Sequence, residues 1–150
     1  MIKLNSNKLD EVLEEARQLP TVKLAVAAAE DEVVLETVKR AEQDGLVEPV
    51  LIGDKNKIKQ ALGVIDYSFK GEIIHTIDNK EAAEKTMELI TYGQADLPMK
   101  GLLSSKTILT ALLKKEYGFR QGKLLNLLTM VQLEKEDRLI FITDAGMNIA

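Results

Sequence analysis

The sequence predicts an α/β domain in which a mostly parallel sheet lies between two layers of helices. Short apolar runs alternate along the chain with stretches whose apolar residues recur at helical spacing, a pattern typical of βαβ units. The first run, VKLAVAAA over Val22–Ala29, is apolar almost throughout, as expected for a central parallel strand covered on both faces. The 150 residues are enough for one core, so we predict a single α/β domain over residues 1–150.

The elements around this first strand follow from apolar spacing and from glycine and proline. An amphipathic helix is predicted over Leu9–Leu19, and a second helix follows the strand and ends near Gly45, which suits a left-handed helix terminus. The next strand is predicted over Val47–Gly53. It contains Pro49, a residue that favours the start or the edge of a strand because it lacks an N–H donor.

The middle of the chain repeats the strand and helix alternation. Asp54 is suited to cap a short helix that reaches about Leu62, and Gly63 is expected to end it. A third strand is expected over Glu72–Ile77. The next helix has the strongest support, because Asp78 lies three residues before a glutamate, the spacing of a capping box.

The last third of the chain contains one more helix and three short strands. A strand is expected to include Ala95–Pro98, and a helix with paired leucines follows Ser105 and ends before Gly118. Two late strands are expected within Leu124–Leu133 and Arg138–Thr143.

Composition excludes several classes of protein and site. The net charge of -4 argues against a dedicated nucleic-acid surface, which needs a basic patch. The chain has no cysteine, so it cannot supply a disulfide, a thiolate metal ligand or a cysteine nucleophile. Its acidic runs lack the spacing of metal ligands, and we expect no metal. No stretch approaches the roughly 20 apolar residues of a membrane span, and we expect a cytoplasmic protein.

The segment Met99–Thr107 is the clearest candidate for a binding site. It places Lys100, Gly101 and the hydroxyls of Ser104 and Ser105 between the end of a strand and the start of a helix. The free N–H groups at a helix start favour phosphate, a glycine permits close approach of the backbone, and a lysine adds positive charge. The same residues also have a purely structural explanation, in which one serine caps the helix and the lysine is solvated.

A second candidate lies at the carboxyl end of the last predicted strand. Asp144 follows that strand directly and Asn148 comes four residues later, and open parallel sheets form their ligand crevices beyond such ends. The alternative is that Asp144 caps a following helix.

Other motifs give weaker indications of function. The stretch GFRQGK over Gly118–Lys123 has three residues between its glycines where a P-loop needs four, and Leu124 follows it, so we reject an ATPase. Arg120 of this stretch remains a candidate phosphate ligand. No GxGxxG follows the first strand, which argues against a nicotinamide site. The single histidine, His75, lies inside a predicted strand, where we expect it to pack or to make one structural hydrogen bond.

Three stretches carry a family resemblance. They are AVAAAEDEVVLETVKRAEQDGLVEPVLIGD, ADLPMKGLLSSKTILTALLKKEYGFRQGKLL and RLIFITDAGMNIA. In this order they resemble the N-terminal half of the phosphate butyryltransferase and phosphate acetyltransferase family. An MKGLxST-like motif of that family corresponds to Met99–Ser105, with Ser105 in place of threonine. A TDAAMNIAP-like motif corresponds to Thr143–Ala150, with Gly146 in place of an alanine.

The resemblance implies a fold, a reaction and a set of site residues. It implies a three-layer domain like domain one of the isocitrate and isopropylmalate dehydrogenase-like fold, within a two-domain, dimeric parent about twice this length. The implied reaction exchanges an acyl group between phosphate and coenzyme A, a substrate rather than a bound cofactor. Lys100, Gly101, Ser104, Ser105, Arg120, Asp144 and Asn148 would bind phosphate or coenzyme A. The catalytic residues are expected beyond residue 150, so this chain alone is expected to be inactive.

Two functions of different classes therefore remain open. The first is a phosphate acyltransferase in which this chain is one half. The second is an incomplete domain that binds anions, coenzyme A or another protein without catalysis. A decarboxylating dehydrogenase would share the fold, but its metal-binding carboxylates are not seen in this sequence.

Overall fold

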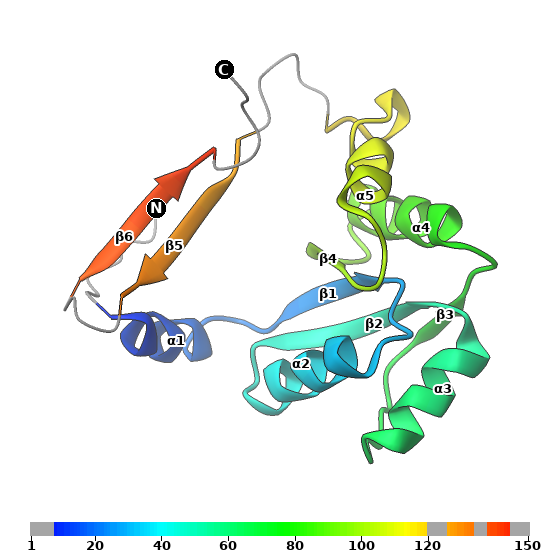
Figure 1. The fold of residues 1–150 in the computed structure, drawn as a ribbon, viewed down its shortest axis with the longest axis horizontal. Helices are drawn as coiled ribbons and strands as arrows, with labels where there is room; N and C mark the ends of the chain where they lie inside the picture. The colour runs from blue at the N-terminus through cyan, green and yellow to red at the C-terminus, as the bar shows by residue number, and fades with distance from the viewer. Residues whose placement is uncertain (1–7, 120–125, 134–137, 145–150) are drawn as a thin grey trace. The chain divides into compact units, whose positions relative to one another are not determined.

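The computed structural model describes residues 8–119, 126–133 and 138–144 (Figure 1). Its backbone divides into two compact units, one formed by residues 1–19 with 122–150 and the other by residues 20–121. Each unit is described by itself. A single domain over residues 1–150 stays a prediction.

The larger unit, residues 20–121, alternates strands and helices. Its elements are β1 (Val22–Ala27), α2 (Glu32–Gln43), β2 (Val47–Gly53), α3 (Lys55–Val64), β3 (Ile73–His75), α4 (Asn79–Thr91), β4 (Leu97–Lys100), α5 (Ser105–Leu112) and the 3₁₀ turn η1 (Lys115–Tyr117). All four strands are parallel, in the order β3-β2-β1-β4. The predicted parallel sheet is confirmed, and the apolar first strand is one of its two central strands.

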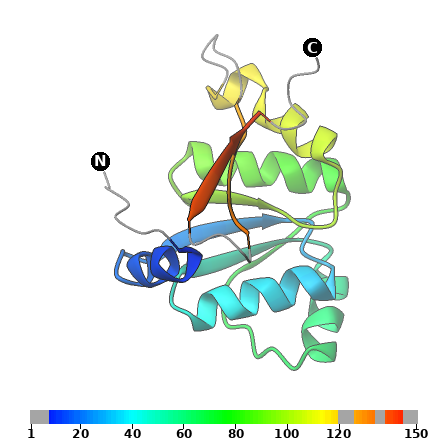
Figure 2. The ribbon, with the colours of Figure 1, turned by 60° about the vertical axis from the view of Figure 1, so that its left-hand side comes forward.

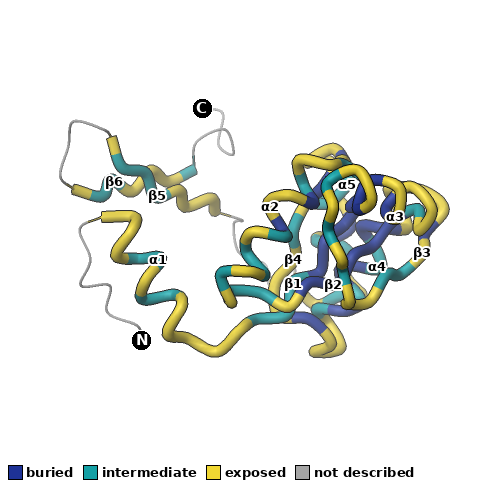
Figure 3. The backbone as a smooth tube through the Cα atoms, turned by 90° about the horizontal axis from the view of Figure 1, so that it is seen from below, coloured by how far each residue is buried: buried dark blue, intermediate teal, exposed yellow. Residues whose placement is uncertain are grey.

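Helices cover both faces of this sheet, as the α/β prediction requires (Figure 2). On one face, Val26 and Leu51 are fully buried against α2 and α3. On the other face, Val50 and Ile52 are buried against α4. Neighbouring residues of one strand point to opposite faces, so both faces of β2 must be apolar. Figure 3 shows the resulting buried band along β1 and β2.

Pro49 lies in β2, which is an inner strand and not an edge. It pairs with Leu24 of β1, whereas pairing with β3 begins only at Leu51. The missing donor of the proline therefore falls in the part of β2 that precedes its pairing with β3. The strand β3 covers only three residues, Ile73–His75, rather than the predicted Glu72–Ile77.

Two predicted boundaries are wrong by a few residues. Gly63 does not end α3, because it has helical geometry and the helix continues to Val64, while Asp66 takes the left-handed conformation with φ 47°. The strand predicted to include Ala95–Pro98 begins later, at Leu97, because the Ala95 N–H still donates to the Leu89 carbonyl at the end of α4.

The helix caps follow the sequence closely. Asp31, Asp54 and Asp78 cap α2, α3 and α4 through their carboxylates. The predicted capping box at α4 is formed by the Glu81 N–H, which donates to Asp78 at 2.8 Å. The Glu81 carboxylate accepts in return from the N–H of Ile77 at 2.7 Å, one residue before the expected cap position.

Asp54 gives a prediction on the pH dependence of stability. Its carboxylate accepts the N–H groups of Lys57 and Asn56, and these two bonds lower its pKa below the ordinary value. The resulting stabilisation is present above the ordinary carboxyl pKa, about 3.9, and is lost as the pH falls through the lowered folded pKa. Asp54→Asn keeps a capping oxygen but does not titrate. We expect urea unfolding to show a smaller loss of stability on acidification for Asp54→Asn than for the wild type, and identical pH dependence would contradict this assignment.

The smaller unit contains α1 (Leu9–Arg17) and a two-stranded antiparallel sheet of β5 (Leu128–Gln132) and β6 (Leu139–Thr143). The predicted first helix and both late strands are confirmed. These strands pair with each other, so β6 is not a parallel strand of the four-stranded sheet.

Candidate functional site

The carboxyl ends of the four parallel strands meet at one edge of the larger unit. This strand-end edge consists of residues 28–31, 54, 76–78 and 101–104, which follow β1, β2, β3 and β4. Ligand crevices of open parallel sheets form at such edges. The predicted segment around Lys100 therefore lies where this fold places its binding sites.

The loops after β1 and β4 are bonded to each other at this edge. The N–H of Gly101 donates to the Ala27 carbonyl at 2.8 Å, and the N–H of Leu102 donates to the Ala28 carbonyl at 2.9 Å. Ala28 is fully buried and has a left-handed φ of 55°, an uncommon conformation for a residue with a side chain. The strained turn directs the backbone of β1 toward the β4 loop.

Gly101 is required by this contact between backbones. A Cβ atom at Gly101 would lie 2.2 Å from the Ala28 carbonyl oxygen and 2.7 Å from that of Ala27. The sequence-based explanation was close approach of a bound anion. The structure shows that the space beside this glycine is filled by the protein's own backbone, so Gly101 fixes the shape of the edge.

Lys100 is exposed at the end of β4, and its ammonium folds back over the loop. It donates to the Leu103 carbonyl at 2.8 Å and to the Gly101 carbonyl at 3.4 Å. Within the described residues, no carboxylate forms an ion pair with it. An ammonium has three donors, so one N–H and the full positive charge remain for an anion.

The two serines divide the roles that the sequence left open. Ser104 is the N-cap of α5: its hydroxyl accepts the Thr107 N–H at 3.0 Å and lies 2.8 Å from the Thr107 hydroxyl. Ser105 is the first residue of the helix and is exposed. The N–H groups of Ser105 and Lys106 belong to the first turn, which has no helical acceptors for them. These two N–H groups therefore have no acceptor within the helix, at the end of α5 that directly follows residues 101–104 of the strand-end edge.

The other three helix starts at this edge carry a carboxylate cap, from Asp31, Asp54 and Asp78. Negative charge there opposes the approach of an anion. Among α2, α3, α4 and α5, only α5 has an uncharged cap, which makes its first turn the most favourable place for phosphate.

Two features of the edge were not found from the sequence. Half-buried Glu30 accepts the Asp54 N–H at 2.7 Å and so joins the ends of β1 and β2. The left-handed Ala28 is the other. Neither has a local signal, because both depend on how strands distant in sequence meet. His75 makes the structural bond that was predicted, accepting the Lys55 N–H at 3.3 Å.

Asp144 lies in the smaller unit, directly after β6. Its carboxylate accepts the Leu127 N–H at 3.3 Å, and its own N–H donates to the Leu127 carbonyl at 2.7 Å. The reason for choosing it was the end of a parallel strand, and that premise is wrong because β6 is antiparallel to β5. Arg120 and Asn148 lie outside the described residues. A site shared by Asp144, Asn148 and Lys100 stays a prediction.

Within the described residues, no group of three or more histidine, cysteine, aspartate or glutamate side chains could hold a metal ion. None of the helices in that part of the chain has the length and apolarity that crossing a membrane requires.

Comparison with solved structures defines the class of fold. The structure matches a branched-chain phosphotransacylase from Enterococcus faecalis V583 with a TM-score of 0.67 and 21% identity, over 87% of this chain and 45% of that protein. The larger unit, with its parallel sheet and helix-flanked edge, thus has the phosphotransacylase type of α/β fold.

Comparison with curated sequences identifies the family. The chain is 39% identical over 144 residues to a phosphate butyryltransferase of Clostridium beijerinckii, covering 95% of this chain and 48% of the relative. It is 32% identical over 128 residues to a phosphate acetyltransferase of Thermotoga maritima, covering 85% and 44%. No family model matches. The chain belongs to the phosphate butyryltransferase and acetyltransferase family, and it spans about half the length of the curated relatives it matches.

Proposed function

We propose that this chain forms part of a phosphate butyryltransferase-like enzyme that converts acyl-coenzyme A and phosphate into acyl phosphate and coenzyme A, and the reverse. The observation that carries the proposal is the 39% identity over 144 residues with a phosphate butyryltransferase. The fold supports it, because the strand-end edge is where parallel α/β proteins bind their ligands.

In the direction of acyl-coenzyme A synthesis, the thiolate of coenzyme A attacks the carbonyl carbon of the acyl phosphate. A C–S bond forms, the bond from carbon to the phosphate oxygen breaks, and phosphate leaves with its negative charge. The chain has no cysteine, and the nucleophile is the substrate itself. We place the base that removes the thiol proton, and the donors to the carbonyl oxygen, in the part of the relatives that this chain does not match.

The contribution of this chain is to bind and position the phosphate. Lys100 supplies a positive charge, and Ser105 supplies a hydroxyl and an N–H group at the start of α5. Ser104 holds the first turn of α5 in place, and Gly101 holds the loop against β1. The proposed roles of Arg120, Asp144 and Asn148 in binding phosphate or coenzyme A rest on the family resemblance alone. Fixed donors of this kind lower a barrier by orienting the substrate and stabilising developing charge.

We predict that inorganic phosphate binds at Lys100 and Ser105. The double variant Lys100→Ala, Ser105→Ala should weaken binding about tenfold, because it removes one charge and one hydroxyl donor. Isothermal titration at low and high salt measures the effect, and the affinity of the wild type should fall with salt.

A matched control removes the same two groups elsewhere. Lys59 of α3 and Ser68 are both exposed in the larger unit, so Lys59→Ala, Ser68→Ala makes the same chemical change away from the edge. Its affinity should equal that of the wild type. Equal affinity in all three proteins would remove the site from the strand-end edge.

The second function is a binding domain without catalysis. A longer chain that contains these 150 residues should catalyse acyl transfer if the first function is correct and should not if the second is correct. A thiol assay measures this activity. A homodimer of that longer chain, with acyl-coenzyme A and phosphate as its substrates, belongs to the acyltransferase proposal and is tested by its mass in solution.

A further inference from the structure

A groove lies between α4 and α5, and none of the residues that line it belongs to the strand-end edge. It has a volume of about 280 Å³. Its polar lining consists of Lys80, Glu84, Lys106, Thr107, Thr110 and Lys114. Ligand pockets for drug-sized molecules begin at about 300 Å³, so this groove suits a smaller group. A single phosphate with a short organic substituent fits that size.

The charge of the groove is positive even after its internal pairing. The Glu84 carboxylate lies 2.8 Å from the Lys114 ammonium, and these two charges offset each other. Lys80 lies at 4.0 Å from the same carboxylate, and its side chain is 79% exposed, so this pairing is weak. Lys106 has no ion pair with any residue of the described ranges. Lys80 and Lys106, one from each helix, therefore leave the lining of the groove with net positive charge.

Hydroxyl donors stand beside these ammonium groups. Thr107 and Thr110 lie on the same face of α5, three residues apart. The Thr107 hydroxyl already pairs with Ser104, whereas the Thr110 hydroxyl has no hydrogen-bond partner in the part of the chain that the structure describes. Thr110 can donate to an anion held between Lys80 and Lys106.

The walls of the groove are held in place by an apolar contact beneath them. Ala83 and Met87 of α4 and Ala111 of α5 are buried together. The side-chain amide of Asn79 donates to the Leu102 carbonyl at 3.3 Å, and this bond joins the start of α4 to the loop before α5. The backbones of α4 and α5 are therefore fixed relative to each other, whereas the exposed lysine side chains must still be ordered when an anion binds.

We infer that the α4/α5 groove is a second anion site, which binds a small phosphate-bearing molecule through Lys80, Lys106 and Thr110. It does not depend on the acyltransferase proposal. Lys100 takes no part, because it is not among the residues that line the groove.

The test is a titration of the isotopically labelled chain with inorganic phosphate, then with methyl phosphate, followed by the amide NMR signals. The signals of Glu84, Thr110 and Ala111 should shift in the wild type. In Lys80→Gln, Lys106→Gln the affinity reported by these signals should fall about tenfold, because two charges are lost.

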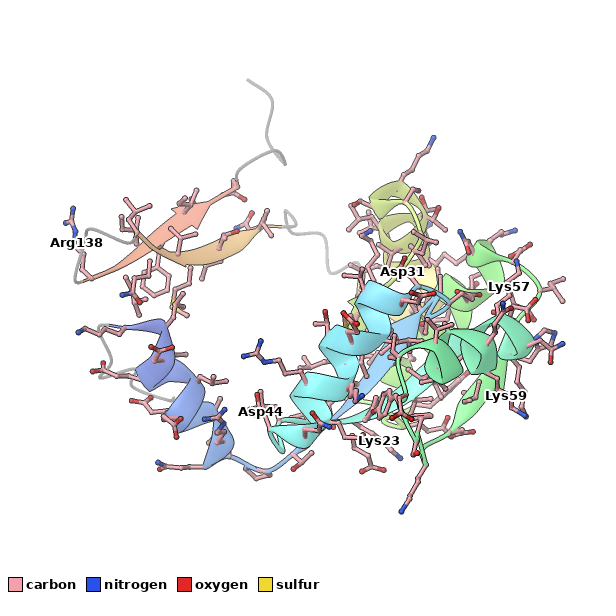
Figure 4. The ribbon with its side chains drawn as sticks, turned by 60° about the horizontal axis from the view of Figure 1, so that its bottom comes forward. Lys23, Asp31, Asp44, Lys57, Lys59 and Arg138 are labelled. Atoms are coloured by element: carbon pink, nitrogen blue, oxygen red, sulfur yellow. The ribbon has the colours of Figure 1, made fainter. Side chains whose placement is uncertain are left out.

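Matched controls separate this site from net charge and from the other site. Lys57→Gln, Lys59→Gln makes the same change of charge on α3 (Figure 4) and should leave the groove signals unaffected. Lys100→Ala, Ser105→Ala should also leave them unaffected. The inference is overturned if the groove signals do not move with either phosphate, or if the α3 control weakens binding as much as the groove variant.

Discussion

Alanine at Gly101 is expected to destabilise the larger unit by about 2–3 kcal/mol, a cost typical of forcing extra atoms into a close-packed interior. The added Cβ would lie 2.2 Å from the Ala28 carbonyl oxygen and 2.9 Å from its carbonyl carbon. These are backbone atoms of the loop after β1, which cannot rotate away as the end of a flexible side chain can. The strand-end edge must therefore open, and the N–H bonds from Gly101 and Leu102 to β1 must lengthen.

Gly63 provides the matched control for this substitution. It lies in α3, nothing would contact a Cβ there within 4 Å, and its φ is not positive. Gly63→Ala should stabilise the protein by about 0.5–1 kcal/mol, because alanine favours the helix and restricts the unfolded chain. Chemical unfolding followed by circular dichroism measures both variants. Similar effects at the two glycines would show that close backbone contact does not explain Gly101.

These two glycines show how far local sequence signals extend. Gly63 was expected to end a helix, because glycine commonly does so. The structure instead ends the helix with Asp66 in the left-handed conformation. Gly101 was identified as a place where the backbone could closely approach an anion, whereas the structure places the backbone of residues 27–28 against it. Its partner could not be identified, because the contact joins β1 to a loop more than seventy residues later in the chain.

The sequence predicted that the sheet is parallel and buried on both faces, but it did not predict the order of the strands. The apolar runs at Val22–Ala29 and Val47–Gly53 report burial on both faces, which is a property of each strand alone. The position of β4 beside β1, which brings Lys100 level with Ala27, depends on the packing of α4 across the sheet. Local spacing also could not show that β6 pairs antiparallel with β5. The argument that placed Asp144 at a parallel edge failed for that reason.

Site features formed by adjacent residues were also predictable, whereas those formed by residues distant in sequence were not. The cap of α5 and the lysine before it could be read from adjacent residues, and the structure assigns the capping role to Ser104 and leaves Ser105 exposed. Glu30, which joins the ends of β1 and β2, needed the tertiary structure. So did the groove lysines, because Lys80 and Lys106 lie on different helices.

The isolated 150-residue chain is expected to show acyl transfer at least about a thousandfold slower than a longer acyltransferase that contains it. The reason is that none of the groups we propose to bind phosphate in this chain is a base for the thiol or a donor to the carbonyl oxygen. Catalysis also needs a base for the thiol and donors for the carbonyl oxygen, all within reacting distance of both substrates. The chain covers 48% of the Clostridium beijerinckii enzyme, and we expect those groups in the portion that the match leaves out.

The measurement is the acyl-phosphate-dependent loss of free thiol from coenzyme A. Three proteins are compared: the isolated chain, the Clostridium beijerinckii enzyme, and a hybrid in which this chain replaces the matching part of that enzyme. The hybrid should regain turnover, and Lys100→Ala, Ser105→Ala in the hybrid should lower it, with the Lys59→Ala, Ser68→Ala hybrid as control. Turnover by the isolated chain would show that the catalytic groups lie within it. A hybrid that is folded by circular dichroism and inactive would favour a binding domain without catalysis.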